Sequence, residues 1–446
     1  MSLQKNWMRP DMMNQRIKRT GIGVIIIVIL LAMYAAYIAF RPTGNEPLAP
    51  VSGAPEDMTS QVTRGEYLAK AADCVACHTV KGGEPFAGGM AFKMPFGTIF
   101  ATNISSDKDH GIGNWSDDEF VAAVRQGISP HGNLYPAMPY TSYTAMSRDD
   151  VLAIKAWLMS LPPSAQPNRQ NDLMFPFNQR WAMKFWNAVF FQDQRFVRDN
   201  AANEDLNRGA YLATALGHCG ECHTPRNLGF AMDKGKELAG AEIQGWLAPN
   251  ISSNPETGIG SWSSEQLSQY LSQGHAPGRS SAAGPMAEVI ENSLQYLTPE
   301  DNRALVKYLQ STPSTESNDG IHINLKPSPA MNSSALLPGD QVNSAGRQLF
   351  AGDCSGCHQW NGPGKVSEHA SLAGSTTVND PKGRSLVQVI LKGAHMEVGD
   401  KQIYMPDFGN KYSDEEVASV ANFVIGHFGD KKGEVTAEQV KKQRDN

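Results

Sequence analysis

The stretch Cys74-Val75-Ala76-Cys77-His78 decides the fold of this chain, because two cysteines three residues apart are followed directly by a histidine. The pattern returns as Cys219-Gly220-Glu221-Cys222-His223 and as Cys354-Ser355-Gly356-Cys357-His358, and the three motifs contain all six cysteines of the 446 residues. Cys-x-x-Cys-His is the attachment signature of a c-type haem, whose vinyl groups take up the two thiols while the imidazole binds the iron. The sequence therefore predicts three covalently bound haem c groups.

Other uses of a Cys-x-x-Cys pair fit this pattern less well. A thioredoxin-like redox pair requires neither the histidine nor three copies. Structural zinc sites could join two such pairs but would leave the third pair alone. The cysteine runs typical of iron–sulfur clusters are absent from the sequence.

A long internal repeat predicts duplicated domains. Residues 103–127 (NISSDKDHGIGNWSDDEFVAAVRQG) recur 147 positions later as residues 250–274 (NISSNPETGIGSWSSEQLSQYLSQG), and Arg-Gly-x-Tyr-Leu-Ala precedes both motifs, from Arg64 and from Arg208. A third, more divergent copy keeps the same order of elements. Each copy opens with an apolar helix that runs into its cysteines and closes with a helix that Ser147, Thr298 or Ser413 caps.

We accordingly expect an all-α protein in which three tandem cytochrome c-like domains follow an N-terminal transmembrane helix. The predicted divisions are a cytoplasmic N-terminus (1–20), a transmembrane helix (21–40), a linker (41–61), domain 1 (62–165), an aromatic-rich segment (166–203), domain 2 (204–315), a linker (316–340), domain 3 (341–430) and a flexible tail (431–446).

Methionines at matching positions are the candidates for the second axial iron ligand. Met138, Met286 and Met405 lie 11, 12 and 12 residues after the glycine that ends a predicted helix in each domain. Met94 and Met396 compete locally, but Met94 precedes the repeated Asn-Ile-Ser-Ser and Met396 follows its glycine too closely. The histidines outside the motifs, including His110 and His218, have no repeated placement.

The N-terminus carries a long uncharged stretch. Residues 21–40 (GIGVIIIVILLAMYAAYIAF) would span about 30 Å as a helix, which is the thickness of the hydrocarbon core of a bilayer. Five basic residues precede it, so the positive-inside rule predicts a cytoplasmic N-terminus and exported haem domains. A cleaved signal peptide is the alternative, although its apolar region would be shorter and a small-x-small cleavage site would follow.

Together, the three motifs, the repeat and the Tyr-Pro-Ala-Met-Pro-Tyr segment (135–140) resemble the triple-haem cytochrome c subunit of bacterial membrane-bound dehydrogenases for alcohols, aldehydes, gluconate and fructose. The resemblance covers nearly all of residues 62–430. It implies an electron-transfer subunit that is not an enzyme on its own, located at the periplasmic face of the inner membrane. Covalent haem attachment would fall to Cys74, Cys77, Cys219, Cys222, Cys354 and Cys357, with His78, His223, His358, Met138, Met286 and Met405 as iron ligands.

The resemblance also implies partners. A catalytic subunit of molybdenum/iron–sulfur, flavin or quinone-cofactor type would supply electrons, which ubiquinone or a terminal oxidase would accept. The apparent N-terminal anchor favours a molybdenum-dependent aldehyde dehydrogenase. We also considered a haem peroxidase or oxidase with one open iron site and a membrane-tethered shuttle without a dedicated partner. The net charge of −6 gives no reason to expect nucleic-acid binding.

The segment 174–196 (MFPFNQRWAMKFWNAVFFQDQRF) is rich in aromatic residues. Trp181 and Phe185 are four residues apart, as are Trp186 and Phe190, so a helix would bring each pair together. Such a helix either packs between the haem domains or forms a docking surface for the membrane or the catalytic subunit.

Overall fold

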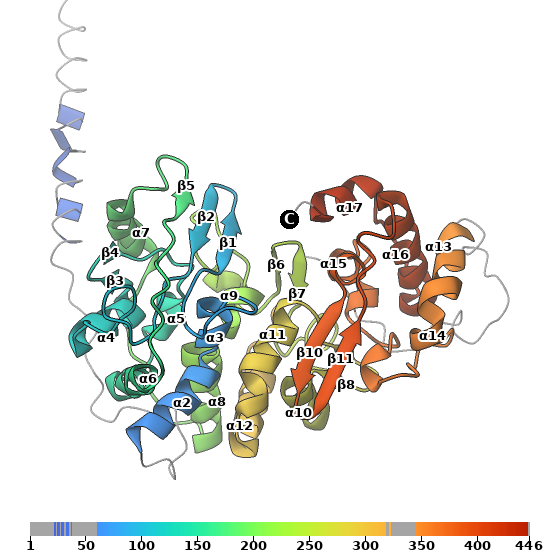
Figure 1. Ribbon diagram of the computed structural model, residues 1–446, viewed down its shortest axis with the longest axis horizontal. Coiled ribbons are helices and arrows are strands. Elements are labelled where there is room, and N and C mark those ends of the chain that lie inside the picture. The colour runs from blue at the N-terminus through green and yellow to red at the C-terminus, as the bar shows by residue number, and fades with distance from the viewer. Residues whose placement is uncertain are drawn as a thin grey trace, which may run out of the picture.

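The computed structural model describes residues 60–317, 321–322 and 344–444, together with short helical pieces between residues 22 and 37. Three groups of helices follow one another along the long axis of the molecule in chain order (Figure 1). Each group is built around a pair of helices that pack closely against each other: α2 with α6, α8 with α12, and α13 with α16.

The first group contains the first motif and the aromatic segment. Its elements are α2 (Gln61–Ala71), α3 (Cys74–His78), β1 (Ala91–Met94), β2 (Gly97–Phe100), α4 (Asp117–Gln126), β3 (Ile128–Ser129), β4 (Gly132–Asn133), α5 (Tyr140–Tyr143), α6 (Arg148–Ser160), β5 (Asp172–Leu173) and α7 (Met183–Phe190).

The second and third groups repeat this order with fewer additions. The second comprises α8 (Glu204–Tyr211), α9 (Cys219–His223), β6 (Ala241–Ile243), β7 (Trp246–Ala248), α10 (Ser264–Gln273), β8 (His275–Ala276), β9 (Ser280–Ser281), α11 (Pro285–Asn292) and α12 (Pro299–Ser311). The third comprises α13 (Ser344–Leu349), α14 (Ser355–His358), α15 (Arg384–Lys392), β10 (Ala394–Val398), β11 (Lys401–Met405), α16 (Asp414–Gly429) and α17 (Ala437–Arg444).

The capped closing helices are confirmed. The Ser147 and Thr298 hydroxyls accept hydrogen bonds from the backbone N–H groups of Asp150 and Asp301, and Ser413 forms a complete capping box. The opening helices approach them closely, because a Cβ on Gly65 would overlap the carbonyl of Ala153. Gly209 meets α12 in the same way, so these two glycines explain why Arg-Gly-x-Tyr recurs.

Domains 1 and 2 share one continuous hydrophobic core, which includes Leu68, Ile154, Leu216 and Leu305. Domain 3 has a core of its own, centred on Phe350, Val417, Ile425 and Phe428. The first two domains thus form one packing unit to which the third is attached.

The all-α prediction is wrong. Among the described residues the structure contains one three-stranded sheet, β1-β2-β5, and four two-stranded antiparallel sheets. Strands of two to five residues are too short to show the alternation of apolar and polar residues by which strands are recognised. The longest hairpin pairs Ala394 with Met405 and Val398 with Lys401.

The predicted transmembrane helix is also unsupported. Half of residues 21–40 lie outside the described part of the chain, and among the described residues no helix is both long enough and apolar enough to cross a membrane. Most of the two predicted linkers lies outside the described residues as well.

The C-terminal end differs from the expected flexible tail. Within the described residues 431–444, α17 packs on α15 and α16 with Val440 fully buried. Arg444 fixes the helix, because its guanidinium donates to Asp414 at 2.9 Å and to the Tyr412 carbonyl at 3.0 Å. Two valines, Val435 and Val440, provide too little periodicity for this helix to be recognised from sequence.

Candidate haem-binding sites

Each Cys-x-x-Cys-His motif forms a short helix directly after the opening helix of its domain. In domains 1 and 2 the residue before the first cysteine, Asp73 or His218, adopts the left-handed conformation and turns the chain into the motif. All six cysteines have free thiols, although the spacing would permit pairing within each motif. The thiols are therefore available for the two thioether bonds of haem c.

The buried surroundings of four of these thiols favour the protonated form. Burial raises the pKa of Cys74, Cys77 and Cys219 to about 12 and that of Cys354 to about 11. Redox exchange and metal binding both require the thiolate, which a raised pKa disfavours at neutral pH.

The three motif histidines share one hydrogen-bond arrangement. Their Nδ1 atoms lie 2.6 Å from the Thr102 carbonyl oxygen for His78, 2.7 Å from that of Pro249 for His223 and 2.7 Å from that of Ala370 for His358. A carbonyl only accepts, so each Nδ1 carries the proton and each Nε2 keeps its lone pair for a metal. Burial lowers the pKa of all three histidines, which favours the neutral form that iron requires.

The repeated Asn-Ile-Ser-Ser sequence holds the carbonyls that orient the histidines. Thr102 and Pro249 directly precede Asn103 and Asn250. The buried Asn103 side chain donates to the carbonyls of Ser164 and Gln166 and accepts from the Ser105 N–H at 2.9 Å. In the same way, the Asn250 side chain donates to the Thr315 carbonyl and accepts from the Ser252 N–H. Sequence reasoning found the repeat but missed this role, for which the only signal was the position of the asparagine.

The three candidate methionines occupy equivalent places in the chain path. In each domain a helix (α4, α10 or α15) ends at a glycine with positive φ, a β-hairpin follows, and the methionine comes at or after its second strand. Met138 follows β4, Met286 lies in the first turn of α11, and Met405 ends β11; all three are partly buried. Their assignment as iron ligands remains a prediction.

The other side chains considered as iron ligands lie in different surroundings. Met396 is 1% exposed and packs from β10 against Gly274 of domain 2, as part of the core of the first two domains. Met94 packs against the small cluster of Ile99, Tyr135 and Leu173. His218 lies edge-on to Tyr143, with 5.4 Å between ring centroids.

Domains 1 and 2 meet through two matching sets of polar contacts. In one, Asp301 accepts from the Tyr67 hydroxyl and from Arg208 at 2.6 and 2.7 Å. In the other, Asp150 accepts from the Tyr211 hydroxyl at 2.8 Å and from Arg64 at 3.2 Å.

In each set the tyrosine comes from one domain, while the arginine and the aspartate come from the other. The interface is therefore isologous, as in a twofold dimer. The sequence analysis recorded these arginines and tyrosines without recognising an interface.

The same interface brings the attachment motif of each domain beside the methionine segment of the other. The Thr141 and Ser142 hydroxyls, just after Met138, donate to Glu221 within the second motif at 2.6 and 2.9 Å. Burial alone would raise the pKa of Glu221, but Arg226 and Thr141 hold it below its ordinary value, so the carboxylate stays charged. In return α11, which carries Met286, packs on α3.

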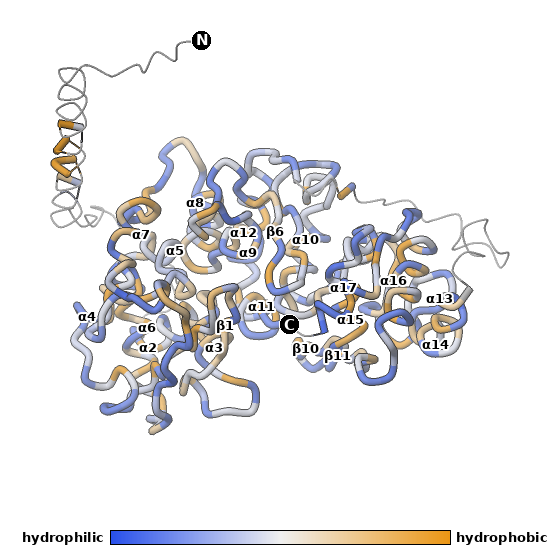
Figure 2. Tube along the Cα trace, turned by 90° about the horizontal axis from the view of Figure 1, so that it is seen from above, coloured by the Kyte–Doolittle hydropathy of each residue, from blue (hydrophilic) through white to orange (hydrophobic). Residues whose placement is uncertain are grey.

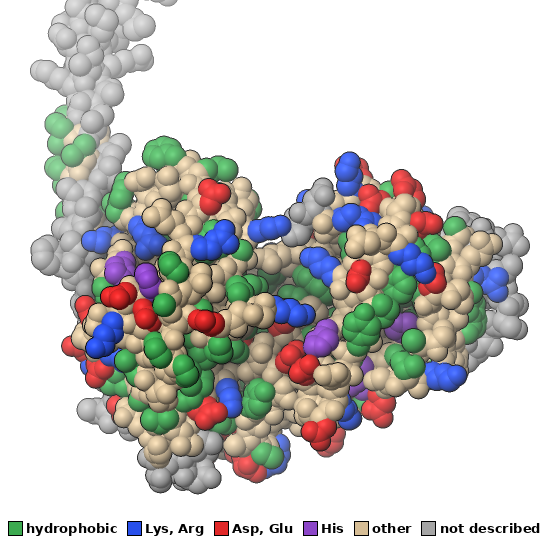
Figure 3. Space-filling model, viewed as in Figure 1, with side chains coloured by type: hydrophobic (Ala, Val, Ile, Leu, Met, Phe, Trp, Pro, Cys, Tyr) green, Lys and Arg blue, Asp and Glu red, His purple; other side chains and the backbone are tan. Residues whose placement is uncertain are grey.

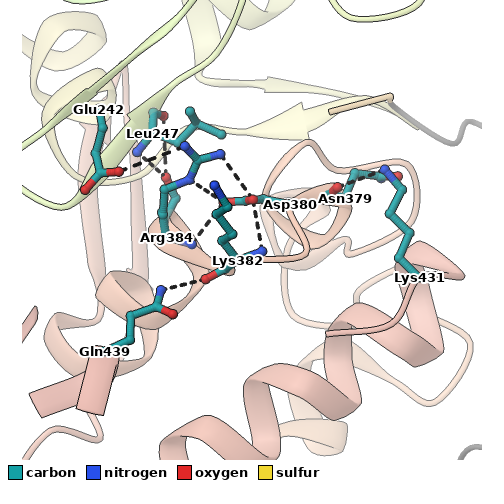
Figure 4. A network of polar contacts seen from close by, with 9 residues as sticks. Glu242, Leu247, Asn379, Asp380, Lys382, Arg384, Lys431 and Gln439 are labelled. Atoms are coloured by element: carbon teal, nitrogen blue, oxygen red, sulfur yellow. Dashed lines mark hydrogen bonds and ion pairs between the residues drawn. The ribbon is translucent and has the colours of Figure 1, made fainter. Parts of the chain in front are cut away.

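Domain 3 contacts domain 2 at several places, one of which is the β8–β9 hairpin, where the Ser281 hydroxyl donates to the His369 carbonyl at 2.9 Å. The β10–β11 hairpin packs on α11, and the Glu397 carbonyl accepts from the Gln295 side chain at 3.0 Å. On the other side the β6–β7 hairpin meets α15, where the Leu247 N–H donates to the Ser385 hydroxyl at 3.0 Å. Figure 4 shows Arg384 at this junction, bound to Asp380 at 2.9 Å and facing Glu242 of domain 2 at 3.9 Å.

Comparison with known proteins identifies two of the three domains. Residues 62–162 match the family model for cytochrome c, and residues 341–424 match that for cytochrome c oxidase, cbb3-type, subunit III.

Full-length relatives show the same kind of subunit. The chain is 41% identical to the fructose dehydrogenase cytochrome subunit of Gluconobacter japonicus, over 86% of this chain and 82% of the relative. It is 39% identical to the gluconate 2-dehydrogenase cytochrome c subunit of Pantoea cypripedii, over 85% and 88%. It is 36% identical to the cytochrome c subunit of the quinone-type alcohol dehydrogenase of Gluconacetobacter polyoxogenes, over 88% and 86%.

Proposed function

This chain belongs to the family of cytochrome c subunits of dehydrogenase complexes, and we propose that it carries three haem c groups in series between a catalytic subunit and a quinone or terminal oxidase. It is an electron-transfer subunit and not the catalytic one. Its cytochrome c domains hold haem covalently, and bound haem c supplies a one-electron carrier. The three attachment motifs support the count of three.

The observation that carries the proposal is the mutual packing of domains 1 and 2 at their motifs. Glu221 joins the second motif to the segment after Met138, and α11, which carries Met286, packs on α3 of the first motif. Two cofactors attached at these positions would be held side by side in one rigid unit. The shared core of the two domains supports the same conclusion.

Domain 2 is proposed to carry the middle haem of the series. Its α11 contacts α3 of domain 1 and β10 of domain 3, so the element carrying Met286 lies between the two other sites. The chain's own residues would hold each haem: the two cysteines would bind the porphyrin, the Nδ1–carbonyl hydrogen bond would orient the histidine, and the methionine sulfur would supply a further iron ligand. Such ligation leaves no open iron position, which speaks against a peroxidase.

For the catalytic partner we propose a dehydrogenase that oxidises a hydroxyl group. The names of the relatives support this, since fructose, gluconate and alcohols each carry hydroxyls. The molybdenum-dependent aldehyde dehydrogenase expected from the sequence stays a prediction. Metal, flavin and quinone analysis of the native complex separates these partners. We further propose a periplasmic location, because haem c is attached there in bacteria.

The proposal that the haem of domain 2 lies between the other two can be tested by removing the haem attachment site of domain 2. Anaerobic substrate is mixed with the native complex and with a complex whose cytochrome carries Cys219→Ser and Cys222→Ser. We expect full haem reduction in the first and rapid reduction of only one of the two remaining haems in the second. If both remaining haems were reduced at equal rates, the proposed order of the three haems would be contradicted. Haem content and the urea midpoint show whether the variant is folded, and Met286→His, which retains the haem, serves as a milder second variant.

A further inference from the structure

The aromatic segment forms an exposed apolar surface at the junction of domains 1 and 2, here called the aromatic surface. It consists of Met174, Phe175, Phe177, Trp181, Phe185 and Val189, together with Leu228 and Phe230 from domain 2. Phe175 is 76% exposed, Trp181 60% and Val189 62%. Figure 2 shows α7 as an apolar stretch on the outside of its lobe, and Figure 3 shows hydrophobic side chains gathered along the edge that holds α7 and β5.

This surface is unlike the rest of the protein. Fifteen large hydrophobic side chains are exposed within residues 60–444 where the structure describes them, and eight of these belong to the aromatic surface. Every exposed phenylalanine and tryptophan in that part of the chain is among the eight. Scattered exposed apolar residues need no explanation, whereas a contiguous aromatic patch indicates a binding surface.

Buried contacts with neighbouring segments hold the aromatic surface in place. Trp186 donates from Nε1 to the Gly229 carbonyl at 2.7 Å, and the Phe190 ring lies against Gly229. Phe96 stacks on Phe177 with 4.3 Å between ring centroids and meets Phe230 edge-on at 5.3 Å. The inner face of α7 therefore packs between the domains, which was one of the two alternatives for this segment, while the Trp181 and Phe185 side chains remain exposed to solvent.

Its charge separates it from the rest of the chain. Residues 172–193 contain two exposed cations, Arg180 and Lys184, and two carboxylates, of which Asp172 is exposed and Asp193 is mostly buried and paired with Arg195, whereas the whole protein has a net charge of −6. Lys234 adds a third cation, since its Nζ lies 3.0 Å from Gln192 Oε1. The aromatic surface is thus locally cationic on an anionic protein.

We propose that the aromatic surface binds the headgroup region of a lipid bilayer that contains anionic lipids. Tryptophan and phenylalanine insert at the boundary between headgroups and acyl chains, while arginine and lysine reach the phosphates. Arg180 directly precedes Trp181 in the sequence and Lys184 directly precedes Phe185, so two of the exposed aromatic residues have a cationic neighbour in the chain. Charge complementarity selects an anionic lipid surface as the occupant. This inference stands apart from the proposed order of the haems.

The test uses the full haem-loaded chain with vesicles of phosphatidylcholine and phosphatidylglycerol that contain a phospholipid with a photoactivatable acyl chain. Cross-linked peptides are mapped by mass spectrometry. We expect adducts within residues 174–190 and 228–230, and at least tenfold fewer around the equally exposed Val197 and Val366. Trp181→Glu with Phe185→Glu should remove the adducts, whereas the control pair Val197→Glu with Val366→Glu should not.

Two results would overturn the proposal. One is that the aromatic surface is labelled no more than the surroundings of Val197 and Val366. The other is that, in the native complex without lipid, the catalytic subunit alone shields Trp181 and Phe185 from oxidative footprinting. That second result would assign the surface to a protein partner.

Discussion

Removing the Tyr67 hydroxyl should destabilise domains 1 and 2 together without affecting domain 3. In the wild-type chain this buried hydroxyl donates to the Asp301 carboxylate and accepts from the Thr298 N–H at 3.4 Å. Burial and the neighbouring carboxylate raise the pKa of Tyr67, so the donor keeps its proton. Tyr67→Phe deletes the donor and leaves Asp301 with Arg208 as its charged partner.

The magnitude follows from the type of bond that is lost. A hydrogen bond to a charged group contributes about 1.5–3 kcal/mol, and the upper half applies here because the N–H at Thr298 loses a partner as well. With a urea dependence of about 3 kcal/mol per molar, a loss of 2–3 kcal/mol lowers the midpoint by about 0.7–1 M. Tyr211→Phe should have a similar effect, because the Tyr211 hydroxyl likewise donates to a buried carboxylate, that of Asp150, and accepts from the Ser147 N–H at 3.1 Å.

The assay is urea unfolding of the haem-loaded chain, followed by tryptophan fluorescence and circular dichroism. The separate cores predict one transition for domains 1 and 2 and another for domain 3. Tyr412→Phe is the matched control, because Tyr412 donates to Asp353 entirely within domain 3. Unchanged midpoints in Tyr67→Phe, or equal shifts in both transitions, would refute the shared-interface reasoning.

Three further predictions concern the candidate sites and the junction with domain 3. Met405→Ala should abolish the methionine–iron charge-transfer absorbance band of one haem. Met396→Ala should keep that band but lower the free energy of unfolding by about 2–5 kcal/mol through lost packing, which urea unfolding measures. His275 of domain 2 faces His369 of domain 3 with 5.1 Å between ring centroids, and burial lowers the pKa of His275 from 6.5. Its contribution to stability is therefore complete above that pH and is lost as the pH falls, so urea midpoints from pH 7.5 to 5.5 should decline less in His275→Gln. Cys357→Ala should leave haem 3 on a single thioether, which mass spectrometry of the unfolded chain would detect.

Local sequence features predicted the parts of this protein that depend on neighbours in the chain. The attachment motifs, the capped closing helices and the pairing of Trp181 with Phe185 are all set within a few residues. The pairing of Tyr67 with Asp301 spans 234 residues, and nothing in either segment alone indicates its partner. The Nδ1–carbonyl bonds were missed for a related reason, since a backbone acceptor leaves no residue-type signal.

The hairpins were missed because glycines and two-residue strands resemble loops in sequence. Gly127, Gly274 and Gly393 were used as markers for counting to the methionines, and each has positive φ at the start of a hairpin. The longest hairpin carries both Met396 and Met405, and its inner face became part of the core of domain 2. Tertiary packing places Met396 in that core, whereas Met405 stays partly buried at the end of β11.

The central claim is that three haem c groups, each with histidine and methionine ligands, carry electrons from the catalytic subunit. The most direct measurement is rapid-mixing absorbance and electron paramagnetic resonance on the native complex with its substrate. We expect three low-spin haems per cytochrome chain at rest, all reduced within the turnover time. A high-spin haem at rest, fewer than three haems per chain, or a haem that substrate never reduces during turnover would contradict it.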